Sequence, residues 1–361
     1  MLSVGIVGLP NVGKSTLFNA VTAAGADVSN YPFTTIDPNI GVVEVPDERL
    51  QRLAELLRPQ KVTPSTVSLI DIAGLVEGAS RGEGLGNRFL GEIRAVDAVA
   101  HVVRCFHDPD VAHVFAAPDP VRDAEIVETE LILADLDILG RVMERRSRDW
   151  QTHPREHDEE RSRLERWKET LESGRPLRAL DPDPATLDEQ KGLGLLTGKP
   201  LLLVANADEE PTAADDDVVA LRRRFPASEV VPLSARLEWE LVQLDPADRA
   251  EFLAELDMEE PGLDRLVTAA FRLLGLITFY TVAKDKLQAW AIPRRTRAPQ
   301  AAGRVHTDME RGFIRAQAVS FDDLMACGSL AHARESGRLR TEGRSYEIAD
   351  GDVVEFLFNV S

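Results

Sequence analysis

The chain has 361 residues, 43% of them hydrophobic, and a formal charge of −19. This length suits two or three domains with sizeable cores. No apolar run reaches the roughly 18 residues of a membrane helix, no signal-peptide pattern is evident, and two cysteines cannot make a disulfide framework. We therefore expect a cytoplasmic protein without membrane contact, whose acidic surface disfavours nonspecific binding of nucleic acid.

The first predicted elements are a strand, a loop and a helix. Residues 3–7 are typical of a buried parallel strand, and residues 16–22 have helical spacing. Between them, residues 8–15 read GLPNVGKS, a complete G-x-x-x-x-G-K-S phosphate loop in the context that this motif requires. We expect Lys14 to reach the β- and γ-phosphates and the Ser15 hydroxyl to ligate Mg²⁺. The predicted triphosphate-binding residues are Asn11, Val12, Gly13, Lys14, Ser15 and Thr16.

Two further segments are typical of nucleotide switches. Strands are expected at 41–45 and 66–71 around a helix at 47–58, and the second strand ends in Asp71-Ile72-Ala73-Gly74. Asp71 is expected to hold Mg²⁺ through water and the Gly74 N–H to bond the γ-phosphate, so that this loop changes shape when the phosphate leaves. In residues 31–36, between the first helix and the strand at 41–45, Thr35 is favoured over Thr34 to complete the Mg²⁺ shell.

The pattern changes after a strand predicted at 98–103. Residues 121–168 are rich in Glu, Arg and Leu at helical spacing, with a polar break at 151–154, and predict an antiparallel helical hairpin. Leu131, Leu133 and Leu139 belong to its expected apolar stripe. The α/β pattern resumes with a strand at 201–205 and closes with a helix at about 262–274. The hairpin, residues 121–196, thus interrupts one nucleotide-binding domain made of residues 1–120 and 197–277.

The base-reading segment departs from that of a GTPase. A GTPase has Asn-Lys-x-Asp after this strand, whereas this chain has Asn206-Ala207-Asp208-Glu209. The longer Glu209 side chain cannot take the place of the aspartate without moving the base, and the lysine stem that packs over the base is missing. We expect weakened guanine selectivity, with Asn206, Glu209 and groups near Ser234 and Ala235 at the base.

The position of the catalytic glutamine is also altered. Many GTPases orient the attacking water with a glutamine after the D-x-x-G glycine. Here that residue is Leu75, which cannot form a hydrogen bond. Either hydrolysis is slow or another group positions the water. Asn11 is a candidate to help hold a K⁺ ion, and His113 is a candidate to orient water, the alternative being an ordinary surface-loop histidine.

The last part of the chain predicts a separate module. Short alternating strands are expected at 287–292 and 352–358, so residues 278–361 form a small α+β domain. The arginine clusters at 222–224 and 294–297 are candidates for local basic faces, and ordinary solvated clusters are the alternative.

The motifs together resemble the Obg-like ATPase family, also called the YchF family. The resemblance rests on the phosphate loop and on residues 31–39, 71–76, 84–87 and 206–209, which read YPFTTIDPN, DIAGLV, GLGN and NADE. Residues 298–303, 305–308 and 312–316 are similar to that family's TGS domain. The resemblance covers essentially the whole chain. It implies an α/β P-loop GTPase-like domain with an inserted helical coiled-coil hairpin and a C-terminal α+β TGS domain.

The same resemblance implies a function. It implies hydrolysis of ATP in preference to GTP, dependence on Mg²⁺ and K⁺, and association with the ribosome, as the large subunit or the 70S particle, and with its RNA. It implies that Leu75 is the hydrophobic residue that replaces the catalytic glutamine in this family. It also implies that His113 has the role of the family's histidine in the flexible loop. Some members carry a cysteine where this chain has Thr34, so redox regulation at that position is not expected to transfer.

The leading hypothesis is a slow ATPase that works as a switch. ATP would order residues 31–39 and 75–90, and hydrolysis would release them. The alternatives are a GTPase with relaxed base specificity, and a ribosome- or RNA-binding adaptor in which the nucleotide only stabilises the fold. We expect a monomer.

Overall fold

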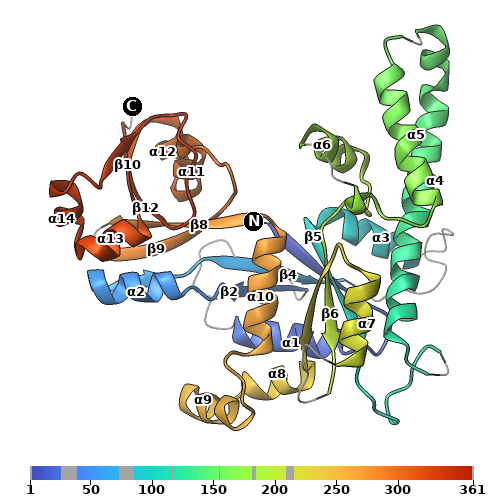
Figure 1. Ribbon diagram of the computed structural model, residues 1–361, viewed down its shortest axis with the longest axis horizontal. Coiled ribbons are helices and arrows are strands. Elements are labelled where there is room, and N and C mark those ends of the chain that lie inside the picture. The colour runs from blue at the N-terminus through green and yellow to red at the C-terminus, as the bar shows by residue number, and fades with distance from the viewer. Residues whose placement is uncertain are drawn as a thin grey trace. The chain divides into compact units, whose positions relative to one another are not determined.

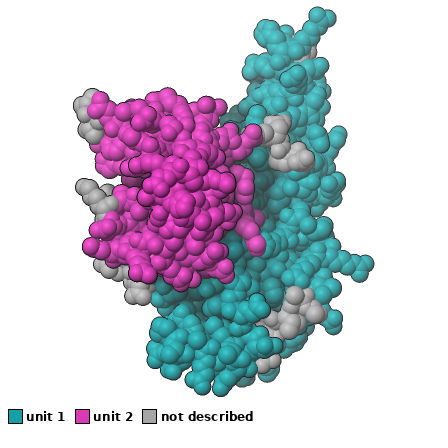
Figure 2. All heavy atoms as spheres, turned by 60° about the vertical axis from the view of Figure 1, so that its left-hand side comes forward, with its two compact units in different colours: residues 1–42, 68–270 teal, residues 43–67, 271–361 magenta. Residues whose placement is uncertain are grey.

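A computed structural model describes residues 2–25, 39–72, 85–115, 117–153, 155–180, 184–208, 215–283 and 285–359. The chain divides into two compact units, residues 1–42 with 68–270 (unit 1) and residues 43–67 with 271–361 (unit 2), coloured separately in Figure 2. Residues 43–67, which the sequence prediction placed in the nucleotide-binding domain, group with the C-terminal residues. No helix among the described residues is long and apolar enough to cross a membrane.

Unit 1 is an α/β unit with a six-stranded sheet in the order β2-β4-β1-β5-β6-β7 (Figure 1). The sheet strands are β1 (Ser3–Val7), β2 (Ile40–Glu44), β4 (Thr66–Asp71), β5 (Ala98–Arg104), β6 (Leu201–Asn206) and β7 (Glu229–Leu233). Strands β4, β1, β5, β6 and β7 pair in parallel, each with its neighbour. Every residue of β5 and β6 is buried, as expected of parallel strands covered on both faces.

Helices accompany these strands in chain order, so the carboxyl ends of the parallel strands share one edge. The helices are α1 (Lys14–Ala24), α3 (Leu85–Ala95), α4 (Pro120–Thr152), α5 (Asp158–Glu172), the 3₁₀ helix η3 (Leu177–Ala179), α6 (Pro184–Leu193), α7 (Asp216–Arg224), α8 (Ala235–Leu241), α9 (Pro246–Glu255) and α10 (Gly262–Leu273). Strands β1, β4 and β6 match the predicted positions to within one residue.

Helices α4 and α5 pack against each other around their own apolar cluster. Trp150, Leu164 and Trp167 are buried in it, and Trp150 Nε1 donates a hydrogen bond of 3.0 Å to Glu160 Oε2 on the facing helix. Leu133 does not join the predicted stripe, because its side chain is 44% exposed on the other face of α4. At the base of the pair, the buried carboxylate of Asp135 accepts bonds of 2.8 Å from the N–H groups of Leu196 and Thr197.

Unit 2 contains the second six-stranded sheet, in the order β11-β10-β12-β8-β9-β3. Its elements are α2 (Glu48–Leu57), β3 (Lys61–Thr63), β8 (Leu276–Ala283), β9 (Lys286–Pro293), α11 (Ala298–Val305), α12 (Thr307–Arg311), β10 (Phe313–Ser320), α13 (Phe321–Cys327), α14 (Leu330–Glu335), β11 (Arg340–Glu342) and β12 (Asp352–Phe358). The expected strand at 287–292 lies within β9, and that at 352–358 coincides with β12.

The sheet of unit 2 has a core on each face. Successive residues of a strand point to opposite faces, and Phe279 packs with one cluster while Tyr280 packs with the other. Leu50 and Leu53 of α2 belong to the Tyr280 cluster, and the Tyr280 hydroxyl donates a 2.7 Å bond to Asp47. Together with the parallel pairing of β3 and β9, these contacts explain why residues 43–67 group with the C-terminal strands.

Candidate nucleotide site

The phosphate loop joins β1 to α1 and ends at Gly13, the residue that caps α1. Gly13 has φ +89° in the left-handed region, which favours glycine. A Cβ there would lie 2.1 Å from Asn206 Nδ2, and a Cβ at Gly8 would lie 2.7 Å from the carbonyl oxygen of Val102. Both glycines of the motif are therefore required by close packing. The loop leads into the free N–H groups of the first turn of α1, which favour a bound anion.

Lys14 and Asp71 meet beside this loop. Strands β1 and β4 are neighbours, with Ile6 opposite Asp71, and the Lys14 Nζ lies 2.8 Å from Asp71 Oδ1. Their side chains are 12% and 22% exposed. The structure thus brings together the predicted phosphate-binding lysine and the predicted metal-binding aspartate.

The donor set is suited to Mg²⁺. Ser15 is exposed in the first turn of α1, and its hydroxyl and the Asp71 carboxylate are hard oxygen ligands. Among the residues that the structure describes, no group of three or more His, Cys, Asp or Glu side chains forms a metal cluster. Two protein oxygens, from Ser15 and Asp71, fit an ion whose other ligands are substrate phosphates and water.

Asn206, at the end of β6, connects the phosphate loop to the β7–α8 connection. Its buried Nδ2 donates a 2.8 Å hydrogen bond to the carbonyl of Val12, and its Oδ1 accepts a 2.9 Å bond from the N–H of Ala235. Ser234 caps α8 by accepting a 3.3 Å bond from the N–H of Leu237. Both side-chain groups of Asn206 are therefore occupied in holding the protein chain.

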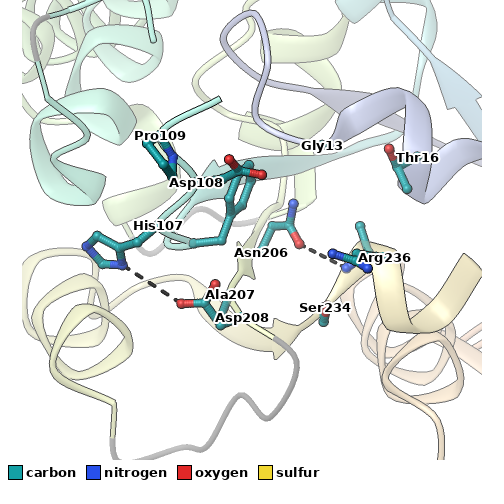
Figure 3. A pocket seen from close by; sticks show the side chains of 12 residues that line it. Gly13, Thr16, His107, Asp108, Pro109, Asn206, Ala207, Asp208, Ser234 and Arg236 are labelled. Carbon is teal, nitrogen blue, oxygen red and sulfur yellow. Dashed lines mark hydrogen bonds and ion pairs between the residues drawn. The ribbon is translucent and has the colours of Figure 1, made fainter. Parts of the chain in front are cut away.

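A pocket of about 410 Å³ lies next to these residues (Figure 3). From the predicted set it brings together Gly13, Thr16, Asn206, Ser234 and Ala235. Its other lining residues are Phe106, His107, Asp108, Pro109, Ala207, Asp208 and Arg236. Loops from the ends of β5, β6 and β7 thus form the pocket at the shared carboxyl edge of the sheet, where α/β proteins bind ligands.

Sequence reasoning missed the 106–109 side of the pocket and the residue that shapes it. The Arg104 side chain, 2% exposed, donates hydrogen bonds to three carbonyl oxygens, those of Phe106, Asp108 and Val111, at 3.3, 2.8 and 2.9 Å. Its guanidinium lies 4.3 Å from the centroid of the Phe106 ring. The signal in the sequence was an arginine at the end of a strand whose other residues, apart from His101, are apolar.

His113 is held against α4. Its side chain is 4% exposed, so it is not an ordinary surface histidine. Nδ1 accepts a 3.1 Å bond from the N–H of Phe115, and Nε2 lies 2.8 Å from Asp123 Oδ2 without the angle of a hydrogen bond. The neighbouring carbonyl of Ala112 accepts a 3.1 Å bond from Asn11 of the phosphate loop. His113 does not line the pocket.

Four predicted site residues, Thr35, Gly74, Leu75 and Glu209, lie outside the described residues. Their assigned roles remain predictions from the sequence.

Comparison with known proteins gives full-length relatives. A family model described as "50S ribosome-binding GTPase" matches residues 3–137, and the model YchF-GTPase_C, described as "Protein of unknown function (DUF933)", matches residues 276–359. "Ribosome-binding ATPase YchF" of Bacillus subtilis (strain 168) is 46% identical over 99% of this chain and 100% of the relative. The protein of that name from Shigella flexneri is also 46% identical, over 99% of both chains. The solved "Structure of the Schizosaccharomyces pombe YchF GTPase" is 33% identical, covers 99% of this chain and 97% of that one, and superposes with a TM-score of 0.88.

Proposed function

The chain belongs to the YchF family, and from that premise we propose that it binds and slowly hydrolyses ATP and associates with the ribosome. The observation that carries the proposal is the phosphate loop beside the 410 Å³ pocket, with Asn206 joining the two. The pocket is the natural place for a base and ribose once the phosphates occupy the loop.

The residues of the loop would each have a defined task. The N–H groups of the α1 N-terminus bind the phosphates, and Lys14 exchanges the Asp71 carboxylate for a phosphate oxygen. Ser15 and Asp71 would hold Mg²⁺, with Thr35 as a proposed further ligand. When bound, the ion would neutralise charge on the phosphates.

The preference for ATP rests on the base side of the pocket. Ala207 stands where a GTPase has the lysine whose stem covers guanine, and Ala207 itself lines the pocket. Proposed contacts to adenine come from groups at Ser234 and Ala235, with Glu209 nearby. The two bacterial relatives are named ATPases and the fission-yeast relative is named a GTPase, so base preference needs a direct test.

His113 is the proposed residue that orients water, since Leu75 cannot. In the arrangement described, its Nδ1 is bonded to the Phe115 N–H and its Nε2 faces Asp123. The imidazole would have to leave Asp123 before it could act on water. This requirement supports a slow intrinsic rate. A K⁺ ion near Asn11 is the proposed source of additional positive charge.

The remaining parts would read the nucleotide state. We assign the helical coiled-coil insertion to residues 121–196 and a TGS domain to residues 278–361. The nucleotide-binding domain is assigned to residues 1–120 and 197–277, without the segment 43–67 that groups with the C-terminal residues. The protein would act as a monomer in the cytoplasm, with the ribosome and its RNA as partners. A GTPase with relaxed base specificity is the second candidate, favoured only by the name GTPase that the fission-yeast relative carries.

The deciding experiment is a titration of the purified chain with fluorescent ATP and GTP analogues, with Mg²⁺ and K⁺ present. ATP should bind more tightly and should displace the GTP analogue. If GTP bound about tenfold more tightly, a difference of about 1.4 kcal/mol, the ATP assignment would be wrong. Ribosome cosedimentation with ATP, with ADP and without nucleotide tests the switch; equal association in all three would favour the adaptor.

A further inference from the structure

Unit 1 contains a second and larger cavity, of about 800 Å³, that shares no lining residue with the nucleotide pocket. Its walls are the N-terminal half of α4, the turn from α5 to η3, and the connection from α7 to β7. Figure 1 shows α7 beside α4, and the two helices are in contact. The proposed nucleotide chemistry makes no use of this cavity.

The cavity is rich in guanidinium groups. Four arginines line it, against two glutamates. Two of the arginines are neutralised within the cavity wall, because Arg178 pairs with Glu128 and Arg224 pairs with Glu125. The other two, Arg175 and Arg223, are exposed and have no side-chain partner among the residues that the structure describes. Both therefore remain available to an anion.

The rest of the lining is largely apolar. Ile132, Pro176 and Phe225 contribute to it, and the Arg224 guanidinium lies 5.4 Å from the centroid of the Phe225 ring. Arginine planes and aromatic rings are surfaces on which unstacked bases pack, while free guanidinium groups bind phosphates. Each nucleotide of an RNA strand presents both groups, a flat base and a phosphate. The volume is within the range of about 300–1,000 Å³ that is usual for ligand pockets.

We propose that this cavity binds single-stranded RNA, with phosphates at Arg175 and Arg223 and an unstacked base against the exposed guanidinium of Arg224, which the buried Phe225 ring supports from behind. The inference rests on the proposed association with the ribosome and names a contact for it. A chain with a formal charge of −19 repels RNA over most of its surface, so a contact with RNA has to be local. The predicted basic cluster at 222–224 thereby gains a specific role through Arg223 and Arg224.

The test compares two double variants of equal charge change. Arg175→Glu with Arg223→Glu alters the cavity, and Arg148→Glu with Arg166→Glu alters exposed arginines of α4 and α5 outside it. Binding of a short fluorescent single-stranded RNA is measured by anisotropy over a range of salt concentrations. The cavity variant should bind at least about tenfold more weakly, a change of about 1.4 kcal/mol. Its plot of log K against log salt should flatten by about 1.4, since each lost phosphate contact removes about 0.7.

The proposal would be overturned if the wild-type chain did not bind the RNA, if the cavity variant bound it as tightly as the wild type, or if both double variants lost the same RNA affinity. If millimolar AMP displaced the RNA while the occupancy of the ATP site stayed the same, the cavity would be assigned to a free nucleotide instead. ATP titration and thermal unfolding verify that each variant is folded. Arg175→Gln with Arg223→Gln removes the charges without adding new ones and should weaken RNA binding in the same direction.

Ribosome pelleting separates this proposal from the proposed function. If the wild-type chain does not pellet with ribosomes, while the cavity variant still binds RNA more weakly than the wild type, the ribosome association is refuted and the cavity assignment stands. If the wild type and the cavity variant pellet equally and bind RNA equally, the cavity assignment alone is refuted.

Discussion

Replacing Asn206 by alanine tests the central connection of the nucleotide site. The substitution removes two buried hydrogen bonds, to the Val12 carbonyl and from the Ala235 N–H. Ala235 and Val12 are each only 1% exposed, so the N–H of Ala235 and the carbonyl of Val12 both stay unsatisfied when the amide is removed. An unsatisfied buried group costs about 1–3 kcal/mol. The expected destabilisation is thus roughly 2–6 kcal/mol.

The assay follows the urea unfolding transition that ATP shifts to higher denaturant, together with the dissociation constant for ATP. If about half of the lost free energy appears in binding, about 1–3 kcal/mol, ATP affinity should fall by about 5-fold to 150-fold. Asn19→Ala, at an exposed position of α1, is the matched control and should change neither quantity. An Asn206→Ala protein that unfolds within about 0.5 kcal/mol of the wild type and binds ATP equally well would refute the reasoning.

Three further variants test other parts of unit 1. Lys14→Ala should reduce ATP turnover, measured as phosphate release, at least about a hundredfold, because no other side chain of the loop supplies a positive charge. Normal turnover in this variant would contradict the assignment of the nucleotide site. Gly13→Ala should weaken ATP binding about tenfold or more, since its Cβ would lie 2.1 Å from Asn206 Nδ2 at φ +89°. Burial, with a smaller effect of the Arg178 charge, lowers the pKa of His101 to about 3. The unfolded chain takes up this proton near pH 6.5, so folding stability should fall as the pH drops from about 6.5 towards 3, by up to about 1.4 kcal/mol per pH unit. In urea unfolding, the His101→Leu variant should lose less free energy of unfolding than the wild type between pH 7 and pH 5. Equal pH dependence in the two proteins would disprove His101 as the origin of the loss.

Much of unit 1 was predictable from local pattern. Its parallel strands are short segments rich in apolar residues, so β1 and β4 appear in the sequence with their observed bounds. The edge strand β7 was not predicted because Pro232 interrupts its apolar run, and proline is tolerated only where a strand has a free edge. Leu133 fitted a helical stripe by spacing, yet a helix packed on one side leaves such a residue outside.

The site was predicted on its phosphate side and missed on its base side. The phosphate loop is contiguous, so its residue types and spacing identify it directly. The 106–109 wall depends on Arg104 bonding three carbonyl oxygens, which no spacing rule expresses. The contact of His113 with Asp123 likewise joins a loop to a helix through tertiary packing, and no sequence pattern pairs the two residues.

The position of residues 43–67 has a consequence for synthesis of the chain. This segment supplies α2 and β3 to unit 2, but the strands that receive them begin after residue 271, about 200 residues later. At roughly 5–20 residues per second, a ribosome needs about 10–40 s to produce that intervening stretch. During that interval the apolar face of α2, with Leu50 and Leu53, has no native partner from unit 2. Unit 2 is therefore completed only at the end of translation, and a fragment cut at the 276–359 family boundary would lack the helix and the strand that complete its core and its sheet.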